Sequence, residues 1–443
     1  MSTRFYLLAT LLFGLPLWSQ VEPGAVGGVI NPDDNERMMV PPPVSGQAYP
    51  TLTGGELRSN FLRTGVTFNA AYNDNLLAGE TPTPIGDTIY TIFPSIILDQ
   101  KTPRQHRVLN YSPGFMFFQN TSQLDEITQA ANVNWEFRLS PRAIMSVSDG
   151  FAQNSNAFSQ PNMFSGGLAA APTPATNAIV IYPFVSQMTN TASVEITYQF
   201  GLNGMVGGSG ATGFFKYPNI SQAAGLFNSN ENSGTAFYSR RLTNSQYLGV
   251  IDEYSNITTS PIATTTNTNA VLGFYTLYWG KNFNASVLAG PQYFQSSGGG
   301  VSEPGSWEPA VMASFNWMGQ HTNLAGSYSR VVGGGGGLLG AYTTDTAALS
   351  GRWVMAKTWN AGIAADYYVL KNVTPQLVGA IPGGRTLTIG CLVHHALTEH
   401  LALEAGYQRL HEKYSGVGFL VTSPDSNQES VSLQYQFVRP LGR

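Results

Sequence analysis

The residues of this chain that could do chemistry are few and widely spaced. Its only cysteine is Cys391, and its six histidines are His106, His321, His394, His395, His400 and His411. His394 and His395 are adjacent, so in a strand their side chains point to opposite faces and cannot act on one ligand. His400 falls in a predicted turn. A single cysteine excludes an internal disulfide framework and a cysteine-based zinc site.

The sequence carries no recognisable catalytic pattern. No Gly-x-Ser-x-Gly element stands in a strand–turn–helix context. The glycine run at 333–337 lacks the Gly-Lys-Ser/Thr ending of a phosphate loop, and we interpret it as a flexible extracellular loop tip. We therefore expect no catalytic residue, no metal site and no cofactor, and we predict that the chain is not an enzyme.

Charged residues are also scarce, and this scarcity excludes several classes of protein. Asp, Glu, Lys and Arg make up 11% of the 443 residues, against about 25% in ordinary soluble domains. The mean hydropathy is only -0.07, so the missing charged residues are not replaced by apolar ones. Neutral polar residues, Gly and Tyr take their place. The 22 Lys and Arg do not outnumber the 26 Asp and Glu, so a nucleic-acid partner is not expected. After residue 20, no apolar run reaches the roughly 18 residues of a transmembrane helix.

The elements that must position the charged residues are strands. From residue 61 onward apolar and polar residues alternate, most clearly in 127–139, 193–200, 283–293 and 431–437. Alternation of this kind is typical of half-buried β-strands. Aromatic residues, among them Trp279 and Trp353, cluster near the predicted strand ends.

Short and long connections alternate along the chain. Short turns are predicted at 140–142, 202–204, 243–246, 280–282, 319–323, 356–360 and 397–400. Longer segments rich in Gly, Asn, Ser and Pro are predicted at 73–86, 120–126, 153–186, 217–234, 256–267, 296–306, 333–342, 371–384 and 411–426. Short periplasmic turns and long extracellular loops are typical of an outer-membrane barrel. The spacing gives about 18 strands, with 16–18 compatible, and both chain ends on the periplasmic side.

We therefore predict an all-β fold, a transmembrane antiparallel up-and-down β-barrel in the bacterial outer membrane, over residues 61–443. Its inward positions, rich in Thr, Ser, Asn, Gln and Gly, are too polar and small for a sandwich core. A secreted β-helix or propeller is the structural alternative. Residues 1–20 have the charged start and apolar run of a signal peptide, as expected in a Gram-negative exported protein. Residues 21–60 lack periodicity and are expected to be a flexible periplasmic segment.

A short motif near the start of the predicted barrel resembles a known family. In Val66–Gly79 an aromatic-x-Asp-Asn element is formed by Tyr72, Asn73, Asp74 and Asn75. Further Pro-containing elements follow at 92–95 and 111–114. Together they resemble the outer-membrane β-barrel porin family associated with exopolysaccharide and capsule gene clusters. The resemblance implies an outer-membrane barrel linked to polysaccharide export.

Seven charged residues fall on strand positions predicted to face water, and they are the candidate pore-lining residues: Glu136, Arg138, Glu195, Glu308, Arg352, Asp366 and Glu404. A basic side chain facing lipid at the membrane midplane costs about 2–4 kcal/mol, which favours the lumen. There the charges would set the field of a pore or form salt bridges that stiffen the wall. Neither sign dominates, so strong ion selectivity is not expected. The 153–186 segment is either a constriction or a disordered surface loop.

Three functions remain open on this evidence. About 18 strands enclose an aqueous channel in porins, so passive or weakly selective solute diffusion is the first hypothesis. The alternative is an accessory component of exopolysaccharide export that binds or guides a glycan. A structural or adhesive barrel that displays its loops is the third. The expected partners are outer-membrane lipid, the barrel-assembly machinery, and small solutes or polysaccharide, with the oligomeric state open.

Overall fold

A computed structural model describes residues 60–76, 84–154, 186–218, 226–280, 282–298, 301–335, 338–374, 383–415 and 425–441. Three predicted segments lie wholly or partly outside these ranges. They are the signal peptide at 1–20, residues 21–59 of the flexible 21–60 segment, and residues 155–185 of the long loop. Within them the only helix is the short 3-10 turn η1 (Ser122–Leu124). No helix in the described ranges is long and apolar enough to cross a membrane.

The rest of the described chain is β-structure. The strands are β1 (Phe61–Asn73), β2 (Asp87–Lys101), β3 (Gln105–Phe118), β4 (Glu126–Arg138), β5 (Ala143–Asn154), β6 (Gln187–Phe200), β7 (Gly204–Lys216), β8 (Asn228–Thr243), β9 (Gln246–Ser260), β10 (Thr264–Trp279), β11 (Phe283–Gly298), β12 (Val301–Ser302), β13 (Ser306–Met318), β14 (Thr322–Gly335), β15 (Leu338–Val354), β16 (Trp359–Asn372), β17 (Gly383–Ala396), β18 (Leu401–Ser415) and β19 (Asp425–Pro440). β12 has two residues and pairs only with the end of β11.

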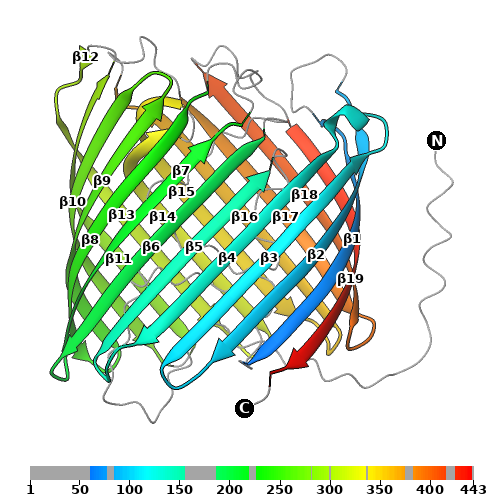
Figure 1. Cartoon of the computed structure of the whole chain (residues 1–443), viewed down its shortest axis with the longest axis horizontal. Helices are drawn as coiled ribbons and strands as arrows, with labels where there is room; N and C mark the ends of the chain where they lie inside the picture. Colours follow the sequence, from blue (N-terminus) through cyan, green and yellow to red (C-terminus); the bar gives the residue numbers. More distant parts are fainter. Residues whose placement is uncertain are drawn as a thin grey trace.

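The strands form one closed antiparallel barrel. Each strand pairs with its sequence neighbours, and β1 pairs with β2 on one side and with β19 on the other. The sheet has nineteen strands, so leaving out the two-residue β12 gives a wall of eighteen. Figure 1 shows the tilted wall, with tight turns between neighbouring strands at one end. The predicted fold class and the expected strand number are confirmed.

The two ends of the barrel differ as the sequence predicts. The seven predicted short turns all lie at one end, which we call the short-turn end, and the chain enters and leaves the wall there. At that point Leu441 N–H donates to the carbonyl of Asn60 over 2.7 Å. We call the opposite end the long-loop end. Two predicted long loops are wrong. In 256–267, β9 continues to Ser260 and β10 begins at Thr264, because the Thr-rich sequence there extends the hairpin, and in 333–342, β14 continues to Gly335 and β15 begins at Leu338.

The outer surface carries aromatic residues near both ends. At the short-turn end Trp279, Trp317 and Trp353 are 42–75% exposed, and Trp359 stacks on His395 with ring centroids 4.1 Å apart. At the long-loop end the exposed aromatics include Tyr90, Tyr254 and Trp307. Exposed apolar side chains such as Val287 lie between these levels. The outside is thus an apolar band with an aromatic border at each end.

Candidate functional site

Each strand presents one row of side chains to the lumen and the alternate row to the outside. In β10, Leu272, Phe274 and Thr276 are at most 2% exposed, whereas Val271 and Tyr275 are 48% and 38% exposed. Because no described part of the chain covers the outside of the closed wall, the buried row faces the lumen. Directly paired residues share a face, so the pairing registers carry this assignment around the barrel.

The seven charged residues singled out in the sequence all occupy inward positions by this register. Glu136 Oε1 and Arg138 Nε are 3.8 Å apart on β4. On β18, Glu404 Oε2 lies 3.7 Å from Nδ1 of His394 on the neighbouring β17. The other members of the set are Glu195 on β6, Glu308 on β13, Arg352 on β15 and Asp366 on β16.

The register also sorts the inward charges along the barrel. In the described strands the inward Lys and Arg lie within three residues of the short-turn end, and they are Arg63, Lys101, Arg138, Arg241 and Arg352. Farther into the lumen the inward charges of the described strands are acidic: Asp87, Glu126, Glu195, Glu231, Glu253, Glu308, Asp366 and Glu412. Asp99, Glu136 and Glu404 lie near the basic level. The short-turn end is therefore mixed in sign, and the inward charges on the rest of the described wall are acidic.

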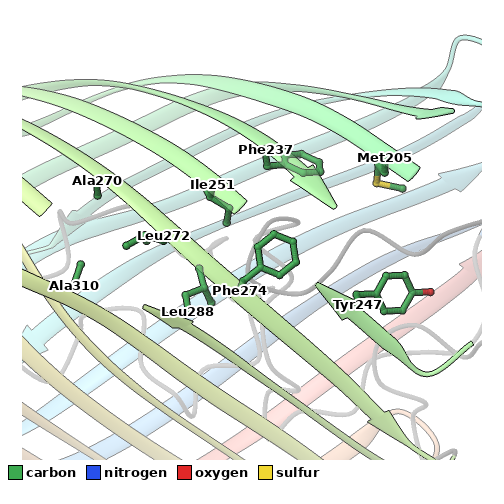
Figure 2. Packing of buried hydrophobic residues seen from close by; sticks show 9 residues of the cluster. All are labelled: Met205, Phe237, Tyr247, Ile251, Ala270, Leu272, Phe274, Leu288 and Ala310. Carbon is green, nitrogen blue, oxygen red and sulfur yellow. The ribbon is translucent and has the colours of Figure 1, made fainter. Parts of the chain in front are cut away.

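One side of the inner wall is apolar, which corrects the expectation of a polar lumen. A cluster of buried side chains runs across β7 to β13 and contains Met205, Phe237, Tyr247, Ile251, Ala270, Leu272, Phe274, Leu288 and Ala310. Figure 2 shows these side chains gathered on one patch of the wall. Sequence alternation could not reveal the cluster, because Val271 and Tyr275 make the outer row of β10 apolar as well. The inner wall of β19 is different: its inward residues are Gln428, Ser430, Ser432, Gln434 and Gln436, which are partly exposed.

The long-loop ends of β14 and β15 leave the wall and pack across its inner face. β13 pairs with β14 only as far as Val311 and Arg330, and beyond that point β14 pairs with β15 alone. There Val332 and Ala341, at most 1% exposed, pack with Phe294 of β11. The glycine run at 333–337 was interpreted as an exposed loop tip. That interpretation is wrong for the part described, since 333–335 belongs to this inward hairpin.

Ionic contacts mark the seam where the hairpin leaves the wall. Arg330 Nη2 lies 3.9 Å from Glu308 Oε2 of β13, and its Nη1 lies 3.7 Å from Asp345 Oδ1 of β15. Tyr328 donates its hydroxyl to Asp345 Oδ1 over 2.9 Å. The side chains of Glu308, Arg330 and Asp345 are about one-fifth to one-third exposed. Glu308, predicted to line the pore, therefore sits beside the root of the hairpin.

An open groove of about 410 Å³ lies at the short-turn end beside the β2–β3 turn. Its charged lining residues are Lys101, His106, Glu136 and Arg138, and His106 Nε2 lies 3.2 Å from Asp99 Oδ1. This arrangement holds groups of both signs. Across the described ranges no group of three or more His, Cys, Asp or Glu residues is placed to hold a metal ion.

The family-like motif lies where β1 meets β19, and its residues are Tyr72, Asn73, Asp74 and Asn75. Asn73 Oδ1 accepts hydrogen bonds from Asn75 N–H and from the Ser426 hydroxyl, both over 2.9 Å. Asp74 accepts from the backbone N–H and the side-chain amide of Asn427, each over 2.7 Å. The motif therefore acts as a clasp that joins the first strand of the wall to the last one.

Comparison with known proteins gives no close relative. No family model matches the chain, and no curated protein matches it. Similar solved structures include the ferric-catecholate import receptor Fiu from E. coli, at 10% identity and TM-score 0.41, covering 86% of this chain and 82% of that one. Pseudomonas aeruginosa OpdK, solved with vanillate, has 8% identity and TM-score 0.41 over 85% of this chain and 99% of its own. At such values, nothing about what these proteins transport carries over.

Proposed function

We propose that the chain is a bacterial outer-membrane pore whose lumen passes small solutes by diffusion and favours cations over anions. The outer surface supports the membrane location, because an apolar band bordered by aromatic residues suits a lipid bilayer with two interfaces. A closed barrel leaves no unpaired strand edge in lipid. Eighteen strands are enough to enclose an aqueous channel.

The proposed cation preference rests on one observation: inward acidic and inward basic side chains lie at different levels along the barrel. Inward carboxylates line the middle of the lumen and its long-loop half, while the inward basic side chains stay at the short-turn end; Glu308 contacts Arg330 at the root of the hairpin. Rings of acidic side chains favour cations in a narrow, partly dehydrated path. A cation entering from the long-loop end would meet carboxylates first and basic groups only on leaving. This proposal differs from the expectation, drawn from the mixed signs in the sequence, that neither charge type dominates.

The test is conductance in planar bilayers. Purified full-length protein should give discrete current steps, and a salt gradient should give a reversal potential of the sign expected for cation preference. Replacing three acids of the lumen together, by Glu195→Gln, Glu253→Gln and Asp366→Asn, should shift that potential toward anions. The matched control is Asp252→Asn, which removes an acid next to Glu253 that faces outward. A protein that inserts without ever conducting would refute the proposal.

A second candidate, guidance of an exported glycan, is favoured by one observation. The inward row of β19, from Gln428 to Gln436, is an uncharged wall of amides and hydroxyls that can hydrogen-bond sugar hydroxyls. Added oligosaccharide should then block the current, and Gln434→Ala together with Gln436→Ala should weaken the block. Unchanged surface polysaccharide after deletion of the gene would count against this candidate.

A further inference from the structure

Three basic side chains lie side by side on the outer surface at the long-loop end. Lys371, Arg385 and Lys413 stand on the adjacent strands β16, β17 and β18, and all three are exposed. We call them the basic patch. Arg385 pairs directly with Lys413, and Lys371 lies one outward position beyond the partner of Arg385 on β16. Neighbouring strands are about 4.8 Å apart, so the patch spans roughly 10 Å.

The basic patch is unfavourable for the isolated chain. Like charges directly opposite each other on neighbouring strands destabilise a sheet. On β18, Arg409 and His411 are compensated, since both contact the Asp425 carboxylate. Within the described parts of the chain, the three residues of the basic patch have no such acidic partner. An anion from outside the chain would remove the repulsion.

The basic patch lies at the height along the barrel where the lipid headgroups of a membrane would be. Tyr367 of β16 and Tyr407 of β18 are exposed on the same outer face, nearer the middle of their strands. Aromatic side chains of this kind lie at the membrane interface. The basic patch therefore lies just beyond the interface, where lipid headgroups are found, and its long side chains can reach along the wall.

The described strands on the other side of the barrel carry no comparable group of basic side chains. On β6 to β10, the outward positions near the same end include Asn190, Thr212, Asn232 and Asn267, which hydrogen-bond to neighbouring strands. In the described strands, the other outward Lys and Arg in the long-loop half are Lys216, Arg330 and Arg409, and the last two contact acidic side chains. The basic patch is thus a local feature and does not belong to a general positive rim.

We propose that the basic patch binds the phosphate groups of a phosphorylated glycolipid in the outer leaflet of the membrane. Arg385 can donate two parallel hydrogen bonds to one phosphate, and the two flanking lysines supply compact positive charge. The acyl chains of that lipid would lie against the apolar band below. This inference rests on the proposed membrane location and is independent of whether the lumen conducts.

The test uses the full-length protein in detergent and three probes: lipid A, lipid A without its phosphates, and inorganic phosphate. The variant Lys371→Gln/Arg385→Gln/Lys413→Gln is compared with Lys216→Gln/Arg240→Gln/Arg439→Gln, which removes three other outward charges. Native mass spectrometry counts bound lipid, and titration gives the affinity. We expect the patch variant to bind lipid A at least about tenfold more weakly than the native chain, since each basic residue near an anionic surface contributes to attraction. The control variant should stay within about twofold.

Each other outcome contradicts the proposal in a distinct way. An equal loss in the control variant would mean unspecific charge attraction. Equal binding of the lipid without phosphates would mean that the headgroup charge is irrelevant, and full competition by inorganic phosphate would mean a site for a soluble anion. Lys413→Gln alone relieves the repulsion with Arg385, so it should fold at least as well as the native chain and still bind lipid A more weakly. Bilayer conductance of each variant reports separately on the pore.

Discussion

Gln292 of β11 makes two hydrogen bonds to the backbone of Val332, a residue of β14, which is not a neighbour of β11 in the wall. Its Nε2 donates to the Val332 carbonyl over 2.9 Å, and its Oε1 accepts from the Val332 N–H over 2.8 Å. The side chain thereby replaces the strand partner that β14 loses when it leaves β13. It ties the inward hairpin to β11, which only β13 separates from β14 in the wall.

Gln292→Leu should loosen this hairpin without opening the barrel. The change leaves both buried backbone groups of Val332 without a partner, which costs about 1–3 kcal/mol each. Hydrogen exchange of the Val332 amide should become faster, and the mean conductance should rise because the hairpin lies in the lumen. Gln434→Leu, on the uncharged wall of β19, is the control and should leave exchange at Val332 unchanged. Unaltered exchange in Gln292→Leu would contradict the role given to the side chain.

Gly249→Ala should destabilise the apolar side of the inner wall. A Cβ on Gly249 would lie 2.2 Å from the Tyr238 carbonyl oxygen and 2.3 Å from the Phe274 ring. The backbone and side-chain shifts that such overpacking forces typically cost about 1–3 kcal/mol of stability. The free energy of unfolding in urea should fall by that order. Gly210→Ala is the matched control, because a Cβ there meets nothing within 4 Å.

Asp87→Ala should release the connection between β3 and β4 at the long-loop end. The Asp87 carboxylate accepts hydrogen bonds from the backbone N–H groups of Thr88, Asn120 and Thr121 and from the Asn120 and Thr121 side chains. Removing it leaves these donors unpaired, so exchange of the Asn120 and Thr121 amides should become faster. Asp99→Ala, near the other end of β2, should leave those amides unaffected. If both variants exchange alike, the carboxylate does not hold the connection.

Cys391 allows a test of the membrane location without adding a thiol. It lies on the outer face of β17, exposed and paired with Ile363 and Tyr407. In proteoliposomes a water-soluble maleimide should label it slowly, and a lipid-soluble maleimide should label it fast. Ser432→Cys in a Cys391→Ala background faces the lumen and should show the reverse preference. Fast labelling of Cys391 by the water-soluble reagent would contradict a lipid-facing wall.

Much of the wall could be predicted because the two rows of side chains on a barrel strand have different surroundings, one row facing the lumen and the other facing the outside. In β6, Val194, Ile196 and Tyr198 face outward and Glu195 inward, so alternation alone assigns both rows. Turns such as 140–142 interrupt the pattern and fix where each strand ends. The same information is missing where both rows are apolar or both polar. Asp252 and Glu253 are adjacent acids on β9, and only the register shows which of the two faces the lumen.

The inward hairpin and the basic patch could not be found in the sequence for a related reason. Gly333–Gly335 has the composition of a loop, and only contacts with residues about 40 positions away, such as Gln292, draw it into the lumen. The residues of the basic patch are separated by long stretches of chain and become neighbours only through pairing of β16 to β18. Local patterns carry no information on such long-range contacts.

The clasp between β1 and β19 has a consequence for how the molecule is made. Asp74 and Asn427 are 353 positions apart, so a ribosome must release nearly the whole chain before this junction can form. Until then β1 presents an unpaired edge, which invites wrong pairing. Nascent chains would therefore need protection in transit until their final strand arrives. Because β19 is synthesised last, its pairing with β1 is the step that closes the barrel.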